Sequence, residues 1–436
     1  MKLSRRRFFT LAGASAAGTL LASPLEALYA RQANGQTIFG TGYGALVPDP
    51  NGLLDLPPGF QYRTFSRTGE LMNDNTLVPG NHDGMAAFPG PRNTVILVRN
   101  HELGTGFSGS RTQGTKPYDP IARGGTTTLV VGANRQLIKH FVSLSGTIRN
   151  CAGGLTPWGS WITCEEDVTL PSATNGVTKP HGYNFEVPAS ATSGVNPEPL
   201  VAMGRFNHEA VAVDPRTGIV YETEDRGDSL FYRFIPTERG NLKAGGTLQA
   251  LKIVGQPRVN TSNSGFRPGQ KLAVEWVTIP NPNPLDGDTV RLQGQELGAA
   301  TFARGEGIWY GNGEFYFCCT SGGAAGAGQV WRYIPPVDGT PESLDLFVES
   351  TSRSELDAPD NIVVAPFGDL ILCEDGGGEN FLRGVNPQGE IYNFARNALN
   401  DSEFCGACFS PDGRTLFVNI QTPGITFAIW GPWTRA

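Results

Sequence analysis

The sequence predicts an all-β protein built as a six-bladed β-propeller. Glycine and proline are abundant, with 57 and 32 residues, and charged residues make up only 17% of the chain. This composition is typical of a protein rich in strands and turns rather than helices. A strand–turn–strand pattern also recurs six times, and acidic or thiol side chains open each copy. The composition, the repeat and the shared opening position together favour a propeller.

The first 30 residues have the pattern of an export signal rather than of a folded domain. Arg5 and Arg6 form a twin-arginine pair, and a short apolar run follows over residues 11–22. That run is shorter than the roughly 20 apolar residues that cross a bilayer. We therefore predict a twin-arginine signal peptide over residues 1–30 and the propeller over residues 31–436, exported by the twin-arginine translocase to the periplasm or the medium.

The charge balance limits the possible partners. Removal of residues 1–30 takes away four basic residues and one acidic residue, so the formal net charge goes from −7 to −10. An acidic protein is a poor partner for nucleic acid or an anionic membrane surface, and it is compatible with cation binding. No second apolar segment reaches membrane length, so we expect no stable membrane insertion. The seven cysteines leave at least one thiol unpaired or committed to another role.

The repeat keeps one register through all six copies. In five copies a proline lies six residues after the opening position, and in the fourth copy Asn312 precedes Gly313. Such residues in a tight turn between apolar strands indicate hairpins. A pair of β-sandwiches is the alternative fold, but it does not predict a constant register. The six copies open at Asp83, Cys151, Glu209, Glu306, Asp360 and Cys405.

The inner strands of a propeller converge on a central channel, so equivalent positions of the blades form a ring. The opening positions place four carboxylates and two thiols at one mouth of that channel. Bare carboxylates this close would repel one another, and cations would neutralise them. We therefore expect a metal cluster at this mouth. Further acids come from the far ends of the hairpins and from just before the last copy: Glu102, Glu165, Glu166, Glu224, Asp225, Glu374, Asp375 and Glu403.

The ligand types suggest both calcium and a transition metal. Numerous carboxylate oxygens favour calcium, whereas a thiolate favours a transition metal. Neither His-Glu-x-x-His nor Gly-x-Ser-x-Gly occurs, so zinc-peptidase or serine-hydrolase chemistry is not supported.

Several residues have a structural explanation as well as a functional one. Glu209 and Glu306 could be solvated loop acids, and Cys151 could be a buried inert thiol. Arg304, two positions before Glu306, is either a salt-bridge partner or a clamp for an oxyanion. His101 and His208 could orient metal ligands or could simply be satisfied imidazoles.

Several long motifs resemble the PhoX family of secreted alkaline phosphatases. They are "RNCAGGLTPWGSWITCEED", "GRFNHEAVAVDP", "YETEDRGDSLFYRF", "FARGEG" and "LDAPDNIVVAPFGDLILCEDG", behind a twin-arginine pattern. The resemblance runs from about residue 50 to the C-terminus. It implies a six-bladed propeller, iron and calcium ions at one channel mouth, and hydrolysis of small phosphate monoesters.

The resemblance also implies roles for individual residues. Glu209, Glu306 and a cysteine look like iron ligands; Cys151 fits the ring register, and Cys164 is the alternative. Arg304 looks like the phosphate clamp, with Arg304, Glu306 and Glu209 as the catalytic set, and Asn207 and His208 are assigned to phosphate binding. Glu224, Asp225, Asp360, Glu374 and Glu403 are similar to the acid-rich stretches of the family and are assigned to calcium. The repeat adds Glu102, Glu165 and Glu166 as metal ligands.

The leading hypothesis is a metal-dependent phosphatase in which a metal-bound oxygen attacks phosphorus while Arg304 takes developing charge. Two rivals remain. One is a calcium-dependent lactonase or esterase propeller, which needs no transition metal. The other is a non-catalytic, calcium-stabilised binding propeller.

Overall fold

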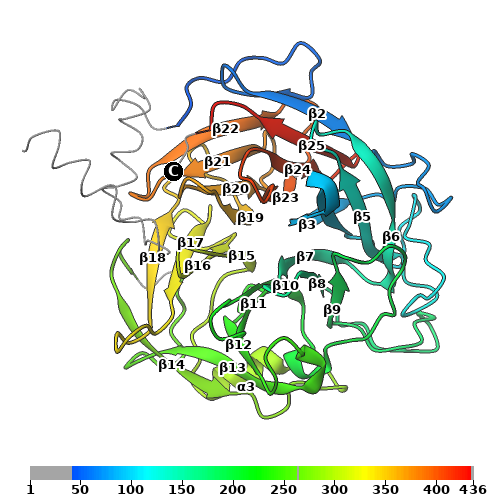
Figure 1. Cartoon of the computed structure of the whole chain (residues 1–436). Coiled ribbons are helices and arrows are strands. Elements are labelled where there is room, and N and C mark those ends of the chain that lie inside the picture. The colour runs from blue at the N-terminus through cyan, green and yellow to red at the C-terminus, as the bar shows by residue number, and fades with distance from the viewer. Residues whose placement is uncertain (1–41, 263–264, 434–436) are drawn as a thin grey trace, which may run out of the picture.

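The computed structural model describes residues 42–262 and 265–433, so the predicted signal peptide lies outside the described residues. The protein is all-β, and its strands surround a central axis in the manner of a propeller (Figure 1). The predicted all-β propeller architecture is confirmed. No helix among the described residues has the length and apolar character needed to cross a bilayer.

Six groups of antiparallel strands surround the axis, and each group extends from its innermost strand outward. The first two groups are β3 (His82–Pro89), β4 (Val95–His101), β5 (Gly124–Val131) and β6 (Leu137–Thr147), then β7 (Asn150–Leu155), β8 (Ser160–Glu165) and β9 (Asn184–Pro188). The next two are β10 (His208–Val213), β11 (Val220–Glu224), β12 (Tyr232–Pro236), β13 (Gly246–Ile253) and β14 (Leu272–Thr278), then β15 (Gly305–Gly311), β16 (Glu314–Cys319), β17 (Gln329–Ile334) and β18 (Ser343–Glu349). The last two are β19 (Pro359–Val364), β20 (Leu370–Glu374), β21 (Phe381–Val385), β22 (Ile391–Asn397) and β1 (Leu54–Asp55), then β23 (Phe404–Phe409), β24 (Leu416–Ile420), β25 (Ile425–Trp430) and β2 (Gln61–Phe65).

Two pairings connect these groups into a closed structure. Strand β14 pairs with both β13 and β18, so the third and fourth groups form one nine-stranded sheet. Strand β2, near the N-terminal end of the described chain, pairs with β25 and completes the last group. The two ends of the propeller chain are therefore tied together in one sheet. Short helices lie in the connections: η1 (Pro91–Asn93), η2 (Val201–Met203), η3 (Leu242–Ala244) and α3 (Val290–Glu296).

Apolar clusters between neighbouring groups hold the ring together. Phe231, beside β12, stacks on Phe317 of β16 with ring centroids 4.4 Å apart and an interplanar angle of 5°. Trp331 and Tyr333 of β17 are fully buried in the same cluster. Because each sheet has a neighbour on both faces, its strands carry apolar residues on both sides, as the nearly unbroken burial of β10, β11 and β24 shows.

Every innermost strand has a β-bulge near the axis. The opening residue of each sequence repeat is the second residue of its strand, and the pairing register with the second strand shifts there or immediately afterwards. A bulge redirects the side chain at its position. The residue after the opening residue is small in five of the six copies, and this lets neighbouring inner strands approach closely. These residues are Gly84, Ala152, Ala210, Gly307 and Gly406, and Asn361 is the exception.

We predict that Gly307→Ala destabilises the ring. A Cβ at this position would lie 2.7 Å from the carbonyl oxygen of Asp360 and 2.8 Å from the Cα of Asn361, so β15 and β19 would have to separate. The free energy of unfolding should fall by about 1–3 kcal/mol. Thermal and denaturant unfolding at matched metal content measure the effect. Gly227→Ala is the control, because its Cβ would meet nothing within 4 Å; equal effects of both substitutions would contradict the proposed close approach.

Candidate metal centre

Each strand group contributes two connected positions to one mouth of the channel. The opening residue of each sequence repeat is here called the ring residue. In all six groups, the residue after the second strand donates its backbone N–H to the carbonyl of the residue two positions before the ring residue, at 2.9–3.2 Å. This repeated bond gives the six mouth segments the same backbone arrangement. The six donor–acceptor pairs are Glu102–Asn81, Glu166–Arg149, Asp225–Asn207, Thr320–Arg304, Asp375–Ala358 and Gln421–Glu403.

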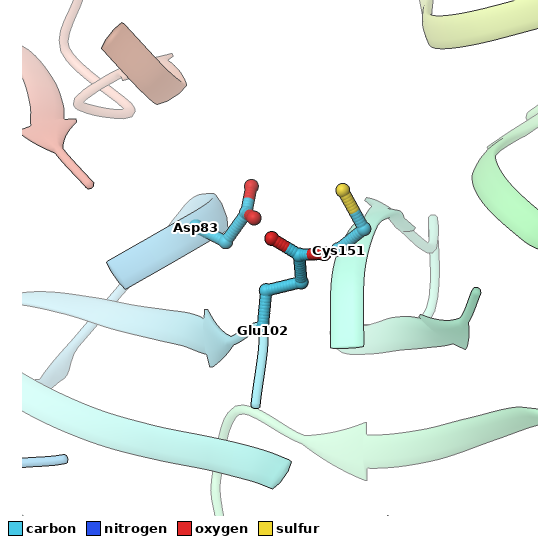
Figure 2. Close-up of side chains that lie close together, drawn as sticks. All are labelled: Asp83, Glu102 and Cys151. Atoms are coloured by element: carbon cyan, nitrogen blue, oxygen red, sulfur yellow. The ribbon is translucent and has the colours of Figure 1, made fainter. Parts of the chain in front are cut away.

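The ring residues and these flanking acids form three overlapping groups of potential metal ligands. In each group one ligand atom from every residue lies within 4.8 Å of the others. Cys151 belongs to two groups and so does Glu209, so the three groups form a continuous band. Figure 2 shows Asp83, Glu102 and Cys151 converging from three different segments. The groups are Asp83–Glu102–Cys151, Cys151–Glu166–Glu209 and Glu209–Glu306–Asp360.

Most carboxyl groups of this band are buried: Asp83, Glu209, Glu306 and Asp360 are buried, whereas Glu102 and Glu166 are partly exposed. Both carboxylate oxygens of Glu209 and Oδ1 of Asp83 are buried without a hydrogen-bond donor among the described residues. Burial raises the pKa of Glu209 well above its usual range, and the negative charges of Asp360 and Glu166 raise it further. Burial and the negative charges of Glu102 and Asp225 raise the pKa of Glu166 to about 8. Burial and the negative charge of Asp375 raise the pKa of Asp360 to about 7. A bound cation would remove this penalty and satisfy the orphaned oxygens.

The ring backbone is fixed by polar side chains from the preceding strand group. Asn100 donates to the carbonyl of Cys151 at 3.0 Å, Thr223 to that of Glu306 at 2.5 Å, and Asn419 to that of Asp83 at 2.8 Å. All three donors occupy the next-to-last position of a second strand. They satisfy carbonyl groups freed at the bulges, so the ligand side chains are held on a rigid support.

Two arginines lie at the mouth, each two positions before a ring residue. Arg304 donates Nε and Nη2 to the two oxygens of Asp225 at 2.8 and 2.9 Å, and Nη2 lies 2.7 Å from Oε1 of Glu306. Burial raises the pKa of Asp225, but Arg304 outweighs it and lowers that pKa below its usual value. Arg149 contacts Glu102 and Glu166, both at 2.6 Å. The sequence prediction of Arg304 at the mouth agrees with this geometry, whereas Arg149 was missed.

Three predicted metal ligands point elsewhere, because strand alternation turns the last residue of the second strand into the blade. Glu165 accepts bonds from the backbone N–H groups of Ile148 and Gly182 and contacts Nδ1 of His181 at 2.6 Å. Glu224 accepts from the hydroxyl of Tyr232.

Glu374 is the third predicted metal ligand that points into the blade, where it pairs with Arg383 at 2.7 Å. The residues one position later, Glu166, Asp225 and Asp375, face the mouth. Each adjacent pair of acids in the sequence therefore contains one structural carboxylate and one candidate ligand.

The structure also places the remaining predicted residues. His208 is fully buried, with Nε2 3.0 Å from the carbonyl oxygen of Gly204 and Nδ1 3.2 Å from Glu222, so it faces away from the mouth and cannot contact a phosphate there. Asn207 lies at the mouth and donates weakly to Asp288 at 3.4 Å. Glu403 lies beside Asp360, and its pKa is raised by burial and by that neighbour.

Three of the cysteines lie in different surroundings. Cys151 lies in the ligand band, whereas Cys164 packs in the apolar cluster around Met203 and Phe206. The Sγ atom of Cys405 donates to the carbonyl of His82 at 2.8 Å. The geometry therefore favours Cys151 over Cys164 as the thiol ligand. All seven cysteines are unpaired and buried.

The sequence matches the model of a known protein family over most of its length. The family model for alkaline phosphatase PhoX matches residues 41–424. The chain belongs to the PhoX family. It is accordingly a phosphoric monoester hydrolase.

A solved PhoX structure shows the same fold. PhoX from Pseudomonas fluorescens, solved in complex with vanadate as a transition-state analogue, has 19% sequence identity and a TM-score of 0.67, covering 90% of this chain and 98% of that one. A gluconolactonase from Xanthomonas campestris has 12% identity and a TM-score of 0.44, covering 90% and 99%. Among curated protein sequences, none matches this chain.

We predict that substitutions of the neighbouring acids Glu165 and Glu166 in this PhoX protein change different properties, stability for Glu165 and metal content for Glu166. Glu166→Gln should reduce bound metal, because Glu166 is in the ligand band, with little change in the unfolding temperature of the metal-free protein. Glu165→Gln should keep the metal but lower the free energy of unfolding by about 1–3 kcal/mol, because its hydrogen-bond acceptors are buried. Elemental analysis and thermal unfolding of both variants measure this. Loss of metal in Glu165→Gln with full retention in Glu166→Gln would contradict the assignment.

Proposed function

We propose that the protein hydrolyses small phosphate monoesters at the channel mouth, using metal ions held by Cys151, Glu209, Glu306 and the neighbouring carboxylates. The observation that carries this proposal is the band of buried, under-partnered ligands beside a guanidinium group, in a chain of the PhoX family. Phosphoryl transfer depends mainly on positioning and on neutralising charge, and cations with arginine supply both.

The donor set fits both proposed metals. The thiol of Cys151 with the carboxylates of Glu209 and Glu306 suits a transition metal such as iron. The carboxylates of Asp360, Glu403 and Asp375 supply oxygen ligands, which suit calcium. When bound, such cations act as Lewis acids that polarise a phosphoryl oxygen and stabilise the charge of the transition state.

The residues of the chain contribute orientation and charge. Arg304 is held against Asp225 and Glu306, so its guanidinium is already aimed at the mouth before substrate binds. We propose that it turns one edge toward the phosphate, taking part of the developing negative charge. Asn207, at the equivalent position of the preceding strand group, donates its amide to the same anion after leaving Asp288.

Several further assignments also belong to this proposal. Membership of an exported phosphatase family supports recognition of Arg5 and Arg6 by the twin-arginine translocase and a periplasmic or secreted location. The substrates are expected to be small phosphorylated molecules. The lactonase alternative rests on no specific contact in this structure, and the binding-only alternative does not explain the arginine beside the ligands.

We predict that metal removal and Glu306→Gln each abolish phosphatase activity. Chelation should lower kcat/KM for an aryl phosphate at least about a hundredfold, and added metal should restore it, because the ring carboxylates lose the ions they share. Glu306→Gln should have a similar effect that metal does not restore.

Glu314→Gln is the control, since Glu314, at the start of β16 away from the mouth, pairs with Arg332 of β17. A lactone assay runs in parallel to test the rival activity. Unchanged phosphate release after chelation and in Glu306→Gln would end the proposal.

A further inference from the structure

Arg149 is the second guanidinium group at the mouth. Its side chain is 43% exposed, and both of its ion pairs use one nitrogen, Nη2, which contacts Glu102 and Glu166. The Nε atom is buried and finds no acceptor among the described residues. Buried polar groups in proteins nearly always have a partner, so this donor calls for an acceptor that the described residues do not supply.

Arg149 and Arg304 occupy equivalent positions in the propeller. Each lies two residues before a ring ligand, Cys151 or Glu306, and each accepts the same backbone bond from the end of a second strand. Both have left-handed backbone conformations, with φ of 48° for Arg149 and 56° for Arg304. The fold therefore presents the two side chains to the mouth in the same way, from the second and fourth strand groups.

A chain of electrostatic interactions connects the two arginines. Glu166 accepts from Arg149 at 2.6 Å, the negative charge of Asp225 raises the pKa of Glu166, and Asp225 accepts from Arg304 at 2.8 Å. The arginines therefore flank one pair of carboxylates, and Glu166 of this pair belongs to a ligand group with Cys151 and Glu209. Arg304 has its Nε–Nη2 edge filled by Asp225, whereas the Nε atom of Arg149 is unused.

We propose that Arg149 is a second phosphate-binding residue, which holds the anion from the second strand group while Arg304 holds it from the fourth. This inference rests on the proposed function of the site. Planar guanidinium groups bind phosphate oxygens through two parallel hydrogen bonds, and Arg149 still has donors for that purpose. The residue thus sets affinity for the phosphate group of the substrate and for the phosphate product.

The competing explanation is that Arg149 only neutralises Glu102 and Glu166. Two substitutions separate these roles. Arg149→Lys keeps the charge but loses the planar fork. Arg149→Asn removes the charge and uses a residue that the fold already has at the equivalent position of the first strand group, where Asn81 adopts φ of 40°. Arg332→Asn is the matched control, because Arg332 also bridges two carboxylates, Glu314 of β16 and Asp345 of β18, neither of which belongs to the ligand band.

The experiment measures inhibition by inorganic phosphate, KM and kcat with an aryl phosphate, and metal content, all on the metal-loaded protein. We expect Arg149→Asn to raise the phosphate inhibition constant and KM about tenfold or more, with Arg149→Lys intermediate and metal content unchanged. The control should change neither constant.

Unchanged phosphate inhibition in both Arg149 variants, or an effect that follows loss of metal, would overturn the proposal. Calorimetric titration of phosphate into the metal-loaded variants gives the same comparison without turnover. If the wild-type protein hydrolyses no monoester, the proposed function fails, while the calorimetric comparison still decides whether Arg149 binds phosphate.

Discussion

Electrostatic repulsion among carboxyl groups at the axis constrains this structure more than any other interaction. Carboxyl groups from all six strand groups meet at the mouth, and the described part of the chain sets two guanidinium groups, Arg149 and Arg304, against them. Burial raises the pKa of Glu209 and Glu306 well above the ordinary range, and neighbouring negative charges raise both further. Buried charges without compensation destabilise a fold by several kcal/mol each. Cations held by these ligands would neutralise the cluster and stabilise it.

The propeller supports that cluster by repetition. Each group places a bulge at the second residue of its inner strand, and a small residue after most of the bulges allows the strands to converge. Asn100, Thr223 and Asn419 hold the ring carbonyls of the following groups. The ligand side chains therefore diverge from a rigid, repeated backbone, and the chemistry varies through the residue placed at each equivalent position. Cysteine in the second group and arginine in the second and fourth groups are such local choices.

The sequence predicted the fold and the ring because both depend on local patterns that repeat. Turn residues and alternating apolar residues identified the hairpins, and constant spacing identified Cys151, Glu209, Glu306 and Asp360. The prediction was weaker where adjacent acids compete for one position. The position of a bulge or strand end decides which of Glu165 and Glu166 faces the mouth. The spacing of residues in the sequence does not reveal that position. His208 was misplaced for the same reason. Arg149 could have been found from its position two residues before Cys151, which matches Arg304 before Glu306.

Anomalous X-ray diffraction from crystals of protein purified from its native compartment tests the central claim most directly, because it locates and identifies bound metals. The account predicts a transition-metal peak bounded by Cys151, Glu209 and Glu306, with calcium density among the neighbouring carboxylates. A mouth that contains no metal in protein that hydrolyses phosphate monoesters would contradict the account.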